Sequence, residues 1–195
     1  MDFKAHIETA WNLTIRYIAP LILMTIVMFA VSLITLGILA PVTMAGYMHA
    51  VLLMVREGRE PRVQDVFSQM RLFLPLFLLG LVIMVVIMIG FMLLVLPGIL
   101  ASVAAAFFLL YVLPLMTDKG MGVMEAVKES FRMSTEKSIV DQLVIVVIYL
   151  GLSAIGGSVF IGWLFTQPFA TVFLMSAYEE KVKRASVSEA PIHPR

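Results

Sequence analysis

The 14 Lys and Arg residues and the 13 Asp and Glu residues all lie in four short segments of the chain. These segments are residues 2–16, 56–71, 118–141 and 179–195. Long apolar stretches without a single charge lie between them. A stretch of about 20 apolar residues is long enough to cross the hydrocarbon core of a bilayer as a helix. This confinement of the charges predicts an integral membrane protein that crosses the bilayer several times.

Composition supports the same conclusion, because lipid rather than water suits a surface this apolar. Hydrophobic residues make up 61% of the 195 residues, charged residues only 14%, and the mean hydropathy is +1.01. An ordinary soluble domain contains about 25% charged residues, and a globule of this size leaves much of its surface exposed. The lack of cysteine excludes disulfides, thiol catalysis and cysteine–zinc sites. A net charge of +1 argues against a nucleic-acid partner.

Six apolar runs predict an all-α fold, a polytopic transmembrane helical bundle of about six helices in three hairpins. The runs are Ile18–Leu36, Pro41–Val55, Leu72–Leu96, Gly98–Met116, Val140–Leu164 and Pro168–Tyr178. The first run is longer than the apolar part of a signal peptide, so we expect it to be retained as a helix. Residues 1–184 would form a single transmembrane domain, and residues 185–195 a flexible cytoplasmic tail.

Prolines divide the apolar runs into pairs. Pro41, Pro97 and Pro168 are each expected to open the second helix of a pair, where the missing N–H costs no hydrogen bond. The runs after Pro41 and Pro168 are short, so they must tilt little, extend into the interface or pack inside the bundle. An alternative places the third turn at Gly156–Gly157 and leaves Pro168 inside the last helix. Pro168 is preferred as the opener because it places Trp163 at the outer interface, where Trp is enriched.

Short amphipathic segments precede the apolar pairs and predict connecting helices that lie in the membrane interface. These segments are Phe3–Arg16, Val63–Arg71 and Val123–Ser134. Apolar residues recur at helical spacing in the last two, namely Val66, Phe67 and Met70 in one and Val123, Met124, Val127 and Phe131 in the other. An amphipathic segment followed by two apolar helices is thus a weak threefold repeat, with coincidence in a chain rich in Val, Leu and Met as the alternative.

Three short motifs carry a family resemblance: Pro41-Val-Thr-Met-Ala-Gly-Tyr47, Val95-Leu-Pro-Gly-Ile99 and Glu125-Ala-Val-Lys-Glu-Ser-Phe-Arg132. With most of the chain, they resemble uncharacterised bacterial six-helix membrane proteins, a group similar to the membrane domain fused to some glycerophosphodiester phosphodiesterases. The resemblance implies a six-helix inner-membrane module with cytoplasmic connecting helices. It implies no phosphodiesterase activity, because 195 residues hold no second, soluble catalytic domain, and it implies no functional residues.

The charge distribution also predicts the orientation in the membrane. Each charged segment contains Lys or Arg, whereas the links near Gly37–Ala40, Leu96–Pro97 and Trp163–Gln167 contain no charge. Basic segments favour the cytoplasmic side of a membrane. We therefore expect a multi-pass protein of the bacterial inner (cytoplasmic) membrane with both termini in the cytoplasm. Membrane lipids are the expected partners, and a membrane or cytoplasmic protein is a further candidate partner.

Ionisable side chains inside the bilayer are the first place to look for function, and this chain has few. His49 lies eight residues after Pro41, well inside the expected bilayer. It is a candidate proton carrier, metal ligand or substrate anchor, but a neutral imidazole bonded to a neighbouring helix is favoured. Asp141 is the second candidate, at the start of an apolar run. Lys137 lies four residues earlier on the same helical face, which favours an ordinary ion pair over a coupling-ion role.

No motif predicts a catalytic, cofactor-binding or metal site. Three of the 15 methionines, Met84, Met88 and Met92, share a helical face, but methionine is an ordinary apolar filler, so no Cu(I) site is expected. Small residues between Gly151 and Gly162 favour close helix packing over a discontinuous transport helix. The interpretation is a non-enzymatic membrane scaffold or accessory module of unknown function, with a small transporter or channel as the alternative.

Overall fold

The computed structural model describes residues 2–135, 139–157 and 160–189, and these residues contain helices and no strands. The predicted all-α class is therefore confirmed. The α-helices are α1 (Phe3–Arg16), α2 (Ile18–Ile34), α3 (Ala40–Glu57), α4 (Phe73–Leu93), α5 (Val95–Phe108), α6 (Val112–Asp118), α7 (Val123–Thr135), α8 (Ile139–Gly157) and α9 (Phe160–Glu189). Two 3-10 helices, η1 (Val63–Phe67) and η2 (Met70–Leu72), precede α4.

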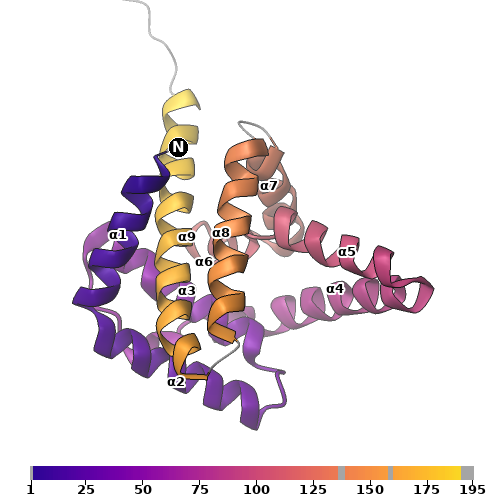
Figure 1. Ribbon diagram of the computed structural model, residues 1–195, viewed down its shortest axis with the longest axis horizontal. Coiled ribbons are helices and arrows are strands. Elements are labelled where there is room, and N and C mark those ends of the chain that lie inside the picture. Colours follow the sequence, from indigo (N-terminus) through magenta and orange to yellow (C-terminus); the bar gives the residue numbers. More distant parts are fainter. Residues whose placement is uncertain (1, 136–138, 158–159, 190–195) are drawn as a thin grey trace, which may run out of the picture.

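Helices α3 and α9 form the centre of the fold. Helix α9 runs between α1 and α8 and also contacts α2 and α3 (Figure 1). Every residue from Ala170 to Glu179 is buried, and α3 is buried along most of its length from Val42 to Met54. The two short apolar runs thus pack inside the bundle, which is one of the three arrangements that their length predicts.

Helices α4 and α5 form a hairpin that projects away from the rest of the protein (Figure 1). The two helices touch where both carry glycine: a Cβ on Gly90 would lie 3.0 Å from the Cα of Gly98. Most other side chains of the hairpin are large, apolar and exposed. Water would make such a surface unfavourable, whereas small residues at the contact and apolar residues outside are what helices in lipid require.

Among the described residues, two helical stretches are long and apolar enough to cross a membrane. They are Val63–Leu93 and Val95–Asp118. Two further pairs qualify if each bent pair is one span: Phe3–Arg16 with Ile18–Ile34, bent by 87°, and Val123–Thr135 with Ile139–Ala154, bent by 110°. Length and composition therefore support two to four crossings, fewer than the six that the apolar runs predict.

The third hairpin turns earlier than predicted. Helix α8 ends at Gly157 and α9 begins at Phe160, so Pro168 lies inside α9 rather than at its start. An internal proline is tolerated in an apolar helix when neighbouring helices and side chains satisfy the freed backbone groups. The alternative turn near Gly156–Gly157 fits the structure better, and the third unit of the proposed repeat loses its opening proline. Helix α9 also extends into the predicted tail as far as Glu189, and residues 190–195 lie outside the described part.

The connecting segment Val63–Arg71 is two 3-10 turns and not the amphipathic α-helix that its spacing predicts. The Asp65 carboxylate accepts the Arg62 N–H at 2.9 Å and caps the first turn. Val66 is buried against α3, whereas Phe67 and Met70 are exposed. The expected common apolar face is therefore divided, because only Val66 reaches the bundle.

The other connecting segment forms the predicted amphipathic helix, α7. Its buried side consists of small residues four apart, Ala126, Ser130 and Ser134. The predicted apolar residues Met124 and Phe131 lie on an adjacent side, 68% and 51% exposed. Val123 and Val127 pack against the core, and Phe131 stacks on the Phe108 ring with the ring centres 4.8 Å apart, so the apolar side of α7 is only partly exposed. A helix with such a partly exposed apolar side suits an interface between protein and lipid headgroups.

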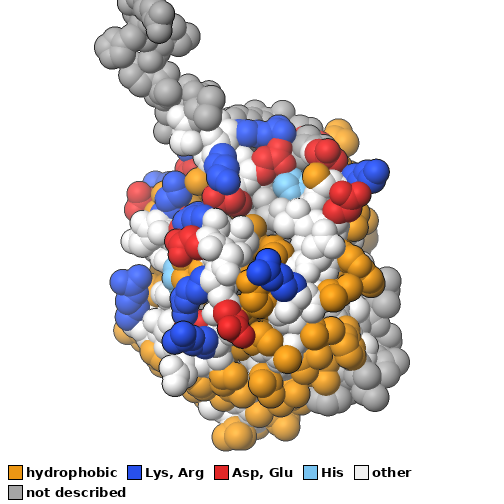
Figure 2. Space-filling view, turned by 90° about the vertical axis from the view of Figure 1, so that its left-hand side faces the viewer, with side chains coloured by type: hydrophobic (Ala, Val, Ile, Leu, Met, Phe, Trp, Pro, Cys, Tyr) orange, Lys and Arg blue, Asp and Glu red, His pale blue; other side chains and the backbone are white. Residues whose placement is uncertain are grey.

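Charged and apolar surfaces are separated on the face seen in Figure 2. Charged side chains occupy its upper part and hydrophobic side chains its lower part. Such a division matches the boundary between headgroups and hydrocarbon that a membrane surface presents.

Gly46 of α3 tests the packing of this fold, since the backbone of η1 lies directly on it. A Cβ at Gly46 would lie 2.3 Å from the Val66 carbonyl oxygen and 2.6 Å from that of Asp65. Gly46→Ala should therefore destabilise the protein by about 1–3 kcal/mol, as overpacking does. Gly151→Ala in α8 is the matched control, because nothing lies within 4 Å of the added methyl group. Thermal unfolding in detergent measures both, and equal melting temperatures would contradict the close contact.

Candidate functional site

The polar side chains of α9 between Ser176 and Arg184 contact neighbouring helices on three sides. We call residues 176–184 the polar segment of α9. Its side chains contact α3 and α6 on one side, α1 on a second, and α7 and α8 on a third. One stretch of one helix therefore joins most of the bundle through charged and polar contacts.

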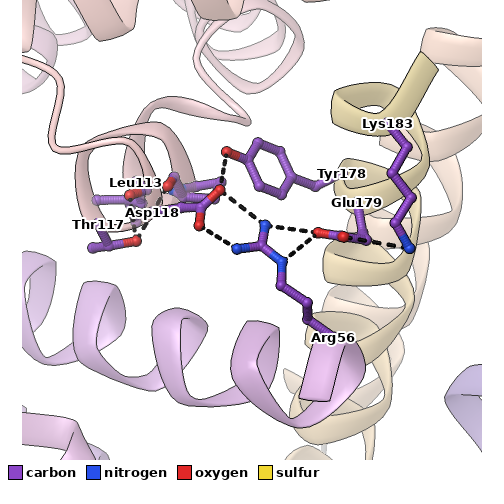
Figure 3. A network of polar contacts seen from close by, with 8 residues as sticks. Arg56, Leu113, Thr117, Asp118, Tyr178, Glu179 and Lys183 are labelled. Atoms are coloured by element: carbon purple, nitrogen blue, oxygen red, sulfur yellow. Dashed lines mark hydrogen bonds and ion pairs between the residues drawn. The ribbon is translucent and has the colours of Figure 1, made fainter. Parts of the chain in front are cut away.

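The first group of contacts is the arginine cluster of Arg56, Asp118, Tyr178, Glu179 and Lys183 (Figure 3). The Arg56 guanidinium donates two hydrogen bonds to Asp118, at 2.6 and 3.0 Å, and two to Glu179, at 2.9 and 2.7 Å. The Tyr178 hydroxyl donates to Asp118 at 3.1 Å, and Lys183 lies 3.5 Å from Glu179. A planar fork with five N–H donors is suited to bridging two carboxylates in this way.

Helix ends explain why these residues meet. Arg56 lies in the last turn of α3, where a positive charge complements the helix dipole. Asp118 is the last residue of α6, where a negative charge is unfavourable unless a cation compensates it. Hydrogen bonds to Asp118 and Glu179 raise the pKa of Arg56. The guanidinium therefore stays charged and pairs with two carboxylates that are themselves nearly buried, and Lys183 supplies a second positive charge beside Glu179.

The second group is the histidine cluster of His6, Ser176, Glu180 and Arg184. His6 places Nδ1 2.7 Å from the Ser176 hydroxyl and Nε2 2.5 Å from a Glu180 carboxylate oxygen, while Arg184 pairs with Glu180. An ionised carboxylate only accepts hydrogen bonds, so Nε2 carries a proton. This arrangement fastens α1 to α9.

His6 is a member of this cluster that the sequence patterns do not single out. It is buried on the same side of α1 as Ala10 and Thr14. The spacing of four residues between a histidine and two small residues was the available signal, since small residues allow α9 to approach closely. His193 lies outside the described residues.

The third group surrounds a break in the helix that follows Pro97. The apolar run Gly98–Met116 is not one helix, because α5 ends at Phe108 and α6 begins at Val112. Ending a helix leaves its last carbonyl groups without partners inside the helix. Polar side chains of α7 and α8 satisfy them: Ser130 donates to the Phe108 oxygen at 2.6 Å, Ser134 to the Phe107 oxygen at 3.1 Å, and Gln142 also to Phe107 at 3.1 Å.

Lys181 of the polar segment completes this third group, the lysine cluster. Its ammonium donates to the Gln142 side-chain oxygen at 2.6 Å and to the Met133 carbonyl at 2.9 Å. It also lies 4.8 Å from the centre of the Tyr111 ring, and the Tyr111 hydroxyl donates to Gln142 at 3.0 Å. Burial lowers the pKa of Lys181 to about 8, and the charge of Asp141 opposes that shift.

The two site candidates from sequence lie outside the arginine and histidine clusters. His49 is half-buried in α3, and its Nδ1 is buried without a hydrogen-bond partner in the described part of the chain. The favoured neighbour bond is therefore not formed at that nitrogen. Asp141 lies in the first turn of α8 and acts electrostatically on Lys181. Lys137, its expected partner, is outside the described residues.

The described residues contain no group of three or more His, Cys, Asp or Glu side chains that could hold a metal ion. Met84, Met88 and Met92 are exposed on α4. No protein-family model, curated protein or solved structure matches this chain.

The motifs behind the family resemblance have packing roles in this structure. Gly46 admits the η1 backbone, Gly98 meets the Phe91 ring, and Ser130 caps the end of α5. Each motif therefore contains at least one residue that makes a contact between elements.

Removing the arginine fork should loosen the junction of α3, α6 and α9. Arg56→Gln removes the guanidinium from two nearly buried carboxylates and leaves Asp118 only the Tyr178 hydroxyl and Glu179 only the exposed Lys183, so we expect a loss of about 2 kcal/mol in unfolding free energy. Arg56→Lys should lose most of the same energy, because an ammonium group cannot bridge two carboxylates with a planar fork. Lys4→Gln, at a side chain 87% exposed, is the control and should change little. Denaturant unfolding in detergent would contradict the idea if Arg56→Lys matched the wild type.

Lys181 should make stability depend on pH. The unfolded chain holds this proton up to about pH 10.5, whereas the folded protein releases it near pH 8. Between these values the unfolded state binds more protons, so stability rises with pH, until unfolded tyrosines begin to ionise near pH 10. Lys181→Met should abolish most of the rise between pH 8 and about 10, and Lys4→Met should keep it. Melting curves across this range measure the difference, and an unchanged slope in Lys181→Met would exclude the assignment.

Proposed function

We propose that the protein is a membrane scaffold or accessory module without enzymatic activity. The observation that carries this proposal is the engagement of hydroxyl groups inside the apolar helices. Thr25, Ser32, Thr43 and Ser102 each donate to a backbone carbonyl three or four residues earlier, at 2.8 to 3.2 Å. A hydroxyl satisfied by its own helix needs neither water nor substrate as a partner. This favours a filled bundle over a hydrophilic path.

Grooves between the apolar helices support the same proposal. One of about 390 Å³ lies between α2, α3 and α9, and Met28, Phe29, Met44 and Trp163 line most of it. Its buried polar member, Gln167, is engaged with Thr171 Oγ1 at 3.4 Å and Met44 Sδ at 3.7 Å. A transport site needs polar groups that converge on open space. The Gln167 amide is instead bonded to protein atoms of the groove wall and of its own helix.

The proposed topology is three hairpins in the bacterial cytoplasmic membrane, with both termini and all charged segments in the cytoplasm. Its support is the convergence of the four charged segments. Arg56 joins the second segment to Asp118 of the third and Glu179 of the fourth, and His6 joins the first to Glu180 of the fourth. The four charged segments therefore lie together, although a pair of apolar runs separates each from the next. This fits a chain that crosses the membrane an even number of times between consecutive charged segments.

The scaffold would act through its charged end and its interfacial helix. Met124 and Phe131 of α7 form an exposed apolar surface beside exposed charges. Such a surface suits lipid headgroups or a protein partner at the membrane boundary.

A small transporter is the second candidate, and the break between α5 and α6 is the observation in its favour. Discontinuous helices at transport sites place backbone groups and charged side chains together inside the membrane. The break has both kinds of group: the backbone carbonyls of Phe107 and Phe108, and the Lys181 ammonium, which is bonded to the same Gln142 side chain as the Phe107 carbonyl. The break is filled by Ser130, Ser134 and Gln142, however, which is why the scaffold is preferred.

Cysteine accessibility separates the two functions, and the chain has no native cysteine to interfere. Ser32→Cys and Ser102→Cys should resist water-soluble maleimides from both sides of the membrane if the bundle is filled. Arg59→Cys and Lys128→Cys are positive controls, and they should react only in membranes opened on the cytoplasmic side. Labelling of positions 32 and 102 would favour a hydrated transport path. Labelling of position 59 or 128 from outside intact cells would overturn the topology.

A further inference from the structure

A pocket with both charged and apolar walls lies at the charged end of the protein, apart from the three clusters. Its volume is about 200 Å³, and it is enclosed by α6, α7, α9 and the link between α6 and α7. Lys119, Glu129 and Arg132 form its charged wall, and Leu115, Met133 and Val182 its apolar wall. An amphiphilic ligand matches such a lining better than a purely polar or purely apolar one.

The charges around the pocket favour an anion. Glu129 is engaged by Arg132, which donates to it at 2.9 and 2.7 Å and is thereby held in place. Asp118, the carboxylate next to Lys119 in sequence, already accepts hydrogen bonds from Arg56 and Tyr178. Lys119 forms no ion pair with a carboxylate closer than 4 Å among the described residues. Within the part of the chain that the structure describes, the lining of the pocket therefore holds two cations and one carboxylate, a net positive charge.

The position of the pocket indicates where the anion comes from. Glu129, Arg132 and Met133 of helix α7 form one wall, and Met124 and Phe131 of the same helix expose apolar surface outside the pocket. In the proposed topology, on which this inference rests, α7 lies at the level of the lipid headgroups of the cytoplasmic leaflet. Basic pockets beside helices at that level are typical sites for phosphate-bearing headgroups.

We propose that this pocket binds the phosphate headgroup of an anionic phospholipid. Lys119 and Arg132 contact the phosphate, Glu129 orients Arg132, and the walls of Leu115, Met133 and Val182 cover the glycerol and the first methylene groups. A lipid so bound would hold α7 against α9 and α6, and it would couple the interfacial helix to the charged end of the bundle.

The test compares lipid binding to the purified full-length chain by native mass spectrometry in a non-ionic detergent. Phosphatidylglycerol should bind the wild type more tightly than phosphatidylcholine. The double variant Lys119→Gln/Arg132→Gln should bind phosphatidylglycerol roughly thirtyfold more weakly, since each basic side chain near a headgroup strengthens binding about five- to sixfold and the two factors multiply. Lys128→Gln, on α7 but outside the pocket lining, is the matched control and should change binding far less.

Glu129→Gln distinguishes binding from structure. It removes the pocket's negative charge, keeps both cations and retains a side-chain oxygen that can accept from Arg132 and orient it, so phosphatidylglycerol should bind at least as tightly as to the wild type. Weaker binding would mean that the Arg132–Glu129 pair only supports the fold, and would overturn the proposal. Equal affinity for the two lipids, or a double variant indistinguishable from Lys128→Gln, would also overturn it.

Competition with inorganic phosphate tests whether the pocket binds a lipid or a free phosphate ion. It should not displace phosphatidylglycerol if the apolar wall contributes, and displacement at equal concentration would show a phosphate-ion site in place of a lipid site. Carbonate extraction of cell membranes keeps this test separate from the proposed function. A chain released by carbonate would contradict the membrane scaffold, whereas a chain retained in membranes that shows no preference for phosphatidylglycerol would contradict the lipid site alone.

Discussion

The guanidinium of Arg56, held between Asp118 and Glu179, is the contact on which the arrangement of the bundle depends. The three residues end or cross three helices, α3, α6 and α9, at the same point. Two carboxylates at this depth would repel each other and lose hydration, and one planar cation removes both costs. Beyond this contact, the other polar side chains of α9 reach α1 on one side and α7 and α8 on the other. The polar segment of α9 thus acts as a common anchor for elements that are distant in sequence.

A second constraint is the need to satisfy the backbone groups that an interrupted helix leaves without partners. The interruption between α5 and α6 exposes carbonyls at Phe107 and Phe108, and serine and glutamine side chains from α7 and α8 occupy them. Such a break is tolerated at membrane depth only where protein surrounds it. Helix α7 therefore has two tasks: its small polar side caps a neighbouring helix, and its apolar side remains outside. Of the residues that make α7 amphipathic, Ser130 and Ser134 cap α5, and Met124 and Phe131 are exposed.

The α4–α5 hairpin follows the opposite rule. It contacts itself through glycines and leaves large apolar side chains exposed, so its stability depends on the surrounding medium rather than on the bundle. The described part of the chain thus combines a polar anchor, a capped helix break and an apolar hairpin with a largely exposed surface. These features fit a membrane module whose contacts lie at its charged end.

The sequence by itself determined the all-helical class, the apolar character and the segments that carry charge, because composition and the lengths of uncharged runs depend only on local residue type. It also predicted α7, whose spacing is regular. Tertiary structure decided the rest. Pro168 lies inside α9, which packs against α3 and α8, and Gly46 lets the backbone of η1 lie directly on α3. His6 became part of a cluster only when α1 packed on α9. The partners of Arg56 lie 62 and 123 residues away in sequence, and no local pattern records which charges at the end of a bundle will meet.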